Sequence, residues 1–435
     1  QNPATATDMY NVAVGHAAGL NVTTGIDNTI VGGLAGDAIT TGNYNSVFGK
    51  SAGGALTEGI ENVLVGVIAG DALTDADYNI AMGSNSLTSD TKGSRSVALG
   101  AYTLSAQNFT TATNTYNVAV GYGGGNDITT GVRNSILGGL ALEKDTLGSN
   151  SVAVGYAALN NQNLTTATDV YNIAVGSLAG LSVTTGIRNV LIGGLAGDAL
   201  TDSDQNVAVG YGALTSDTLG KNSVAVGNNA LENQNFTTAT DTFNVAVGVN
   251  AGNAITTGVQ NTIVGALAAD AMTVGQNNVA MGVAALSSDV GGSRSVAIGR
   301  GALETQNMGT TDTNSHNVAV GYAAGGAVTT GTQNTLVGGL TGDAITTGTN
   351  NTFLGYRSGS ATTTANGNTG VGTDALKTNI LGAHSIAIGS AALETQNYAT
   401  ATSAYNVGVG SNVGASITTG VFNTIVGGLA GDALT

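Results

Sequence analysis

The sequence predicts an all-β fold, a parallel β-solenoid of the β-roll type with about 24 coils and a 17-residue period. A five-residue phrase recurs 24 times: an Asn or Ser, three apolar or small residues, then a closing glycine, first at 11–15. Of the 23 spacings between closing glycines, 18 are 17 residues and five are 21 or 22. So strict a period indicates one structural unit stacked on copies of itself.

Composition fits a solenoid and limits the partners. The chain has 68 Gly, 1 Pro and no Cys, and only 9% of its residues are charged. The net charge of −16 argues against nucleic acid and anionic membranes as partners. No apolar run approaches the roughly 18 residues of a membrane span, so we expect no membrane insertion of this segment.

We treat residues 1–435 as one continuous repeat array, because each solenoid coil contacts only its neighbours. Gln1 stands where an initiator Met would, and the last unit stops partway at Thr435. We therefore expect a fragment of a longer fibre.

Each phrase alternates as a β-strand does, with positions two and four on one side and position three on the other. Position four is always aliphatic, Met or Phe, which predicts that this side faces the core. Position three is Ala in 13 of the 16 coils where position two is Val or Ile, and it is larger in seven of the eight coils where position two is Thr or Ser. This exchange predicts that position three is buried too, against another arm of the coil or another chain.

The residues after the strand form a corner, a second short arm and a loop. Four residues after the closing glycine stands Gly or Leu in nearly every coil. After Gly, the residue three further on is aliphatic, with Thr362 as the exception; after five of the leucines it is Asp or Asn. One large apolar side chain therefore fills each arm from either of two places.

A single thin coil rich in Ala and Gly buries little apolar area, so we expect three chains to pack side by side through position three. The trimer-packing strand positions predicted in this way include Ala13, Ile30, Ala119, Ile136, Ala225, Ile263, Ala319, Leu336, Phe353 and Ile425.

The phrases at 222–227, 295–299 and 385–389 resemble the head repeats of trimeric autotransporter adhesins, and the unit at 317–331 resembles repeats of bacteriophage tail fibres. The resemblance covers essentially the whole chain. It implies a parallel β-roll in which three chains wind side by side, with the recurring strand lining the three-fold axis.

The five long spacings hold extra loops that begin Gln-Asn and continue through threonines. One interpretation is that they present an apolar side chain and threonines to a ligand. The candidate ligand-facing residues are Phe109, Thr110, Thr111, Leu164, Phe236, Met308 and Tyr398. The alternative, which we favour, is that the large side chains tuck back to cap a wider coil, with Tyr116, Tyr171 and Tyr405 packed nearby, because large aromatic side chains are rarely left exposed as a patch.

Two Asp-x-Asp pairs, Asp75/Asp77 and Asp202/Asp204, stand in equivalent loops. Carboxylates at this spacing could hold calcium if a neighbouring coil adds oxygens. Ordinary Asx-type turns are the explanation we favour, so we expect no cofactor.

Catalysis finds little support, because the three histidines stand in unrelated contexts and no nucleophile is paired with a base. Glu143, Glu232, Glu304 and Glu394 recur after Ala-Leu corners, but each stands alone. An ice-binding solenoid is also disfavoured, because the threonines of Thr-Thr-Gly point to opposite faces.

These patterns favour a non-enzymatic, extracellular fibre shaft or adhesin, on a cell surface or a virion, that attaches through a host-surface glycan or protein. The alternatives are a self-assembling filament or sheath subunit, a tailspike-like depolymerase and an ice-binding solenoid. A fold alone does not choose among them.

Overall fold

The computed structural model describes residues 8–435 and confirms the predicted fold class, a parallel β-solenoid of about 24 turns. Among the described residues there are strands and turns but no helix, and hence no helix that could cross a membrane. The chain groups into two compact units, residues 8–211 and 212–435.

The recurring phrase forms a three-residue strand in every coil. In the first unit these strands are β1 (Val12–Val14), β2 (Thr29–Val31), β3 (Ser46–Phe48), β4 (Val63–Val65), β5 (Ile80–Met82), β7 (Val97–Leu99), β9 (Val118–Val120), β10 (Ser135–Leu137), β12 (Val152–Val154), β14 (Ile173–Val175), β15 (Val190–Ile192) and β16 (Val207–Val209). In the second unit they are β18 (Val224–Val226), β20 (Val245–Val247), β21 (Thr262–Val264), β22 (Val279–Met281), β24 (Val296–Ile298), β26 (Val318–Val320), β27 (Thr335–Val337), β28 (Thr352–Leu354), β29 (Thr369–Val371), β31 (Ile386–Ile388), β33 (Val407–Val409) and β34 (Thr424–Val426).

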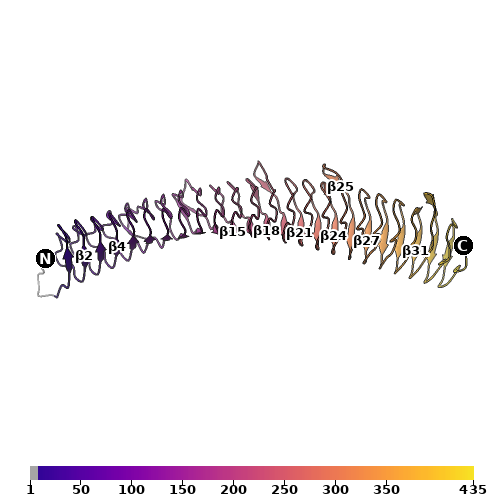
Figure 1. The fold of residues 1–435 in the computed structure, drawn as a ribbon, viewed down its shortest axis with the longest axis horizontal. Helices are drawn as coiled ribbons and strands as arrows, with labels where there is room; N and C mark the ends of the chain where they lie inside the picture. The colour runs from indigo at the N-terminus through magenta and orange to yellow at the C-terminus, as the bar shows by residue number, and fades with distance from the viewer. Residues whose placement is uncertain (1–7) are drawn as a thin grey trace. The chain divides into compact units, whose positions relative to one another are not determined.

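Within each unit successive strands pair in parallel, position against position. Ala13 lies beside Ile30, and Ile30 beside Val47. The strands therefore form one side of the stacked coils (Figure 1). The remainder of each coil is built from turns and contains no second long strand.

The five long coils add short two-stranded sheets at the inserted loops. These pairs are β6 (Gly93–Ser94) with β8 (Thr113–Asn114), β11 (Gly148–Ser149) with β13 (Thr168–Asp169), β17 (Gly220–Lys221) with β19 (Thr240–Asp241), β23 (Gly292–Ser293) with β25 (Thr313–Asn314), and β30 (Gly382–Ala383) with β32 (Thr402–Ser403). In the second unit β25 lies away from the side that carries β24 and β27 (Figure 1).

The predicted inside and outside of the main strand are reversed in the structure. Position three points into the chain's own coil, and positions two and four point outward and stay partly exposed. Position three is therefore filled by its own chain and cannot line an axis between chains. Ile30, Ala119, Ile136, Ala225, Ile263, Ala319, Leu336 and Phe353 are buried in this way, Ile425 is half-buried, and Ala13 is exposed in the first described coil.

The closing glycine sets how closely two coils can stack. Gly138 has a φ of +147°, which side-chain-bearing residues rarely adopt. A Cβ added there would lie 2.3 Å from the carbonyl oxygen of Gly155, the closing glycine of the next coil. Because the Gly155 oxygen belongs to the backbone and cannot rotate away, the clash could be relieved only by separating the two coils.

An asparagine ladder runs through the interior beside the closing glycines. Position one is fully buried, as at Asn45 and Asn62. The Asn45 Oδ1 accepts the Asn62 backbone N–H at 3.0 Å, and the Asn45 Nδ2 donates to the carbonyl of Gly59 at 2.9 Å. Each side chain thus satisfies backbone groups of its own coil and of the next one.

The compensation predicted inside each arm is confirmed, and the structure explains its exception. Phe353 is the largest fully buried side chain at position three. A Cβ at Gly359 would lie 2.3 Å from the Phe353 ring, and one at Gly370 would lie 2.9 Å from it. Phe353 thus fills the space that an aliphatic residue fills elsewhere, and Thr362 suffices in that coil.

Two adjacent glycines test the stacking constraint. Gly138→Ala should lower the unfolding free energy by about 3 kcal/mol or more, because strain and a backbone clash add together. Gly139→Ala is the matched control, since a Cβ there meets only ordinary contacts, the nearest at 3.8 Å. Guanidinium unfolding measures both, and equal stability of the two variants would contradict the constraint.

Candidate functional surfaces

The outward positions of the main strands form an apolar face along each unit. Position four carries only Val, Leu, Ile, Met or Phe, and position two only Val, Ile, Thr or Ser. Several of these side chains are markedly exposed: Phe48, Met82, Val118, Leu137, Ile173 and Ile192 in the first unit, and Val247, Met281, Leu354, Ile386 and Ile388 in the second. No charged side chain interrupts the face.

The extra loops do not present their large side chains to solvent, so the expected ligand-facing role is wrong for most of them. Phe109, Leu164, Phe236 and Tyr398 are 5–7% exposed, and Met308 is half-buried. The hydroxyl of Tyr398 donates to the carbonyl of Gly420 at 2.6 Å. The tucked-back alternative is therefore confirmed for these side chains.

Other parts of the loops do reach solvent. Thr110 and Thr111 are exposed, as predicted. Tyr116, Tyr171 and Tyr405 are also about half exposed. The exposed part of each loop is thus a short, polar, threonine-bearing tip.

A buried polar cluster, which the sequence analysis missed, anchors each loop. The carboxylate of Asp217 accepts hydrogen bonds from the backbone N–H groups of Gly220 at 3.0 Å and Phe236 at 3.1 Å. It also accepts one from the Gln234 Nε2 at 2.6 Å. The Gln234 Oε1 in turn accepts from the Nδ2 of Asn244, a member of the asparagine ladder, at 2.8 Å.

The same cluster recurs in all five long coils, with variations. The acidic position is Asp90, Asp145, Asp217 and Asp289, with Asn379 in the fifth, and the glutamines are Gln107, Gln162, Gln234, Gln306 and Gln396. In each of these coils position one is Ser instead of Asn, and the Gln Nε2 donates to that Ser Oγ. The sequence does carry a signal for this cluster. In each long coil an Asp or Asn is followed by a Gly three residues later and by a Gln 17 residues later.

The charge of these carboxyls is sensitive to burial. Burial raises the pKa of Asp145, Asp217 and Asp289, while hydrogen bonds from the glutamine and from backbone N–H groups act in the opposite direction. The nearby glycine is required, because a Cβ at Gly220 would lie 2.1 Å from the Asp217 carboxylate.

The Asp-x-Asp pairs serve coil-to-coil hydrogen bonds. The Asp77 Oδ1 accepts from the Ile60 N–H at 2.9 Å, and the Asp204 Oδ1 accepts from the Ile187 N–H at 3.0 Å. The Asp202 carboxylate accepts from the Thr185 hydroxyl. Within residues 8–435, no group of three or more His, Cys, Asp or Glu side chains could hold a metal ion.

The Thr-Thr-Gly loops use their first hydroxyl in the same way. The Oγ1 of Thr23 donates to the Thr40 carbonyl at 3.0 Å, and that of Thr329 donates to the Thr346 carbonyl at 3.1 Å. These hydroxyls tie one coil to the next and do not form a free array.

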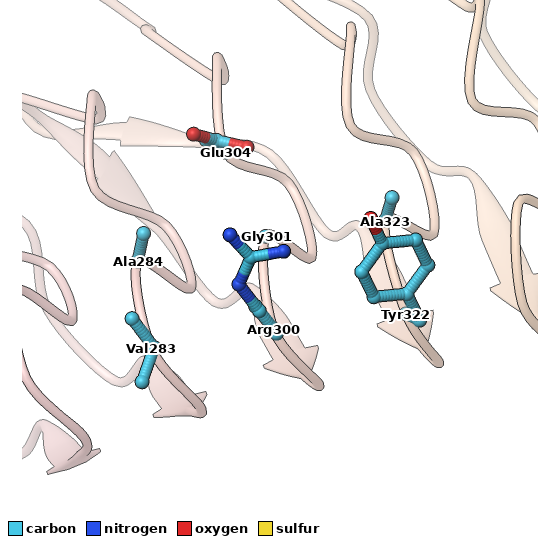
Figure 2. A pocket seen from close by; sticks show the side chains of 7 residues that line it. All are labelled: Val283, Ala284, Arg300, Gly301, Glu304, Tyr322 and Ala323. Carbon is cyan, nitrogen blue, oxygen red and sulfur yellow. The ribbon is translucent and has the colours of Figure 1, made fainter.

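The recurring glutamates are dispersed along the corners. Glu143 and Glu232 accept hydrogen bonds from Asn160 and Asn253, and Glu394 pairs with Lys377 at 3.1 Å. Glu304 lines a shallow depression of about 100 Å³ whose rim also carries Arg300 and Tyr322 (Figure 2). The lining brings together no nucleophile and base.

A comparison of the sequence with models of known protein families gives no match, and a comparison with curated proteins finds no similar sequence.

The raised carboxyl pKa predicts a pH dependence. A carboxyl whose pKa is raised by folding contributes stability that is complete below its ordinary value of 3.8 and is lost as pH rises through the folded-state pKa. Replacing Asp145, Asp217 and Asp289 by Asn should therefore remove part of the stabilisation seen on acidification. Asn379 shows that an amide fits this position, donating to the Gly382 carbonyl.

The measurement is the unfolding free energy of wild type and triple variant between pH 4 and pH 7. The unfolding free energy of the wild type should increase relative to that of the triple variant as pH falls. An exposed control, Asp241→Asn, should follow the wild type. If the wild type's unfolding free energy relative to the variant did not change with pH, or increased toward neutral pH, the raised pKa of these carboxyls would be contradicted.

Proposed function

We propose that the protein is a non-enzymatic, extracellular fibre shaft or adhesin, built as a homotrimer, that projects a binding surface from a cell or a virion. The apolar outer face of the main strands is the observation that carries this proposal. The proposed contact between chains therefore runs through positions two and four, in place of position three.

We expect an apolar face of this kind to be buried against a partner. Contiguous exposed apolar patches beyond a few hundred Å² are rare on soluble monomers and mark association sites. Here the face continues over twelve coils in each unit, with side chains such as Leu137 and Ile192 exposed by 52% and 38%.

A second copy of the chain is the occupant that the charge distribution favours. With a net charge of −16, identical chains repel one another wherever their charged surfaces meet. The outer face is free of charge, so copies can approach there and bury Val, Leu and Met side chains without bringing acidic groups together.

An attachment role fits the remaining surface. The exposed loop tips recur along the chain, so a trimer would display them in rings suited to multivalent binding. A glycan or a protein of a host surface remains the proposed ligand of this fibre.

A filament or sheath subunit is the second candidate. It would join copies end to end through coil backbones and not through the outer face. A depolymerase role has weaker support because the glutamates are dispersed along the corners. An ice-binding role has weaker support because hydroxyls of the Thr-Thr-Gly loops, such as that of Thr23, donate to backbone carbonyls.

Solution mass tests the proposal directly. Light scattering after size exclusion should give the mass of three chains, and replacing Leu137 and Ile192 together by Glu should give the mass of one or weaken the assembly. Thr111→Glu, on an exposed loop tip, is the control and should leave the trimer intact. A wild-type monomer would contradict the proposal, and concentration-dependent polymers that tolerate the double substitution would favour the filament.

A further inference from the structure

One edge of the first unit carries an exposed row that alternates tyrosines with charged residues. The row consists of the residue directly before position one in each coil. Over the first eight coils it reads Tyr10, Asp27, Tyr44, Glu61, Tyr78, Arg95, Tyr116 and Arg133, and we call it the tyrosine row. Its tyrosines are 41–74% exposed.

The backbone holds the tyrosine row in register. The N–H of Tyr44 donates to the Ile26 carbonyl at 3.1 Å, and the N–H of Tyr78 donates to the Ile60 carbonyl at 3.0 Å. The adjoining strands pair position against position from β1 to β9. Paired strands lie about 4.8 Å apart, so tyrosines in alternate coils are separated by about 9.6 Å.

Rings at this position meet their neighbours face-on along the row. The Arg95 guanidinium carbon lies 5.0 Å from the centroid of the Tyr78 ring. In the second unit, residues of the same position stack as His384 on Tyr405, with centroids 5.1 Å apart, and Tyr405 on Phe422, at 5.6 Å. The interplanar angles are 12° and 15°.

Arg95 therefore shows that a guanidinium can lie against a tyrosine ring of the row. It stands in the coil midway between Tyr78 and Tyr116, at a distance from the Tyr78 ring that suits a cation–π contact. The two preceding gaps, Tyr10 to Tyr44 and Tyr44 to Tyr78, have the same coil spacing but hold a carboxylate, Asp27 or Glu61, at the middle position.

We propose that these two gaps bind arginine side chains of an extended, basic peptide segment from a partner protein. Each guanidinium would lie between two tyrosine rings and pair with the carboxylate of the intervening coil. Arginine fits because its planar guanidinium stacks on aromatic faces and hydrogen-bonds a carboxylate in bidentate geometry. The net charge of −16 attracts such a segment.

The spacing of the gaps sets the spacing of the arginines. The gap centres are two coils, about 9.6 Å, apart. In a peptide extended as a polyproline II helix, residues three positions apart lie on the same side and are separated by about 9.3 Å. An Arg-x-x-Arg segment can therefore reach both gaps at once, and the second contact gains from its proximity to the first.

Calorimetric titration of the purified chain with the capped peptide Arg-Gly-Gly-Arg tests the proposal. One peptide should bind per chain, with an affinity that falls as salt is added. Tyr44→Ala removes a ring from both gaps and should weaken binding at least fivefold, and Glu61→Gln should weaken it severalfold. Tyr156→Ala, an equally exposed tyrosine outside the row, is the matched control and should bind as wild type does.

A gain of binding provides the complementary test. Arg95→Glu should turn the third gap into a further site, so that Arg-Gly-Gly-Arg-Gly-Gly-Arg binds this variant several times more tightly than it binds wild type. The peptide Gln-Gly-Gly-Gln should bind neither protein.

Three results would overturn the proposal: no binding of the arginine peptide, equal affinity of wild type and Tyr44→Ala, or a changed solution mass of Tyr44→Ala. The last result would assign the row to the contact between copies of this chain. The unfolding transition of each variant verifies that it is folded.

Discussion

The asparagine ladder is the interaction on which the solenoid depends. A coil of 17 residues encloses little apolar volume, yet it must bury the carbonyl and N–H groups at its corners. In most coils the asparagine at position one solves this problem, because its side chain accepts from the next asparagine's backbone N–H and donates to a carbonyl 14 residues on. The closing glycine lets the coils approach closely enough for these bonds to form.

The long coils are variations on this ladder. Where Ser replaces Asn, the missing amide is supplied by the glutamine that begins the inserted loop, so that Gln234 lies between Ser223 and Asn244. The loop is then fixed by the Asp217 carboxylate, which accepts its backbone N–H groups. A loop is therefore inserted without breaking the polar interior, and in three of these coils burial raises the pKa of the acid, at Asp145, Asp217 and Asp289.

The period, the parallel strands and the exchange of volume between arms could all be predicted from the sequence, because each leaves a residue pattern at fixed offsets. The inside and the outside of the strand could not. Positions three and four are both apolar, and alternation alone does not say which side is enclosed. The thin core selects Ala at position three, while Val, Leu and Met at position four remain outside. The positive φ of residues such as Tyr44 and Leu87, at 60° and 52°, could not be predicted from the sequence either. Stacking of the coils overrides the local preference of these residues.

Some features of the candidate surfaces could likewise be predicted from the sequence and others could not. Threonines at the loop tips were predicted to be exposed and are exposed, whereas Phe109 and Phe236, named as candidates for ligand contact, are buried, as the favoured interpretation had it. A large apolar residue in a short loop is drawn back onto the coil by the gain in burial. The outer apolar face and the tyrosine row became visible only when the register of the coils was known.

The most direct measurement on this account is the unfolding free energy of Asn261→Leu. This substitution fills a similar volume but leaves the Gly275 carbonyl and the Asn278 N–H without their partners. The ladder predicts a loss of about 3 kcal/mol or more, since buried polar groups are left unsatisfied. The neighbouring change Asn277→Gln, at a position that is Gln in other coils, should have little effect. A loss at Asn261 within about 0.5 kcal/mol of that control would contradict the central role of the ladder.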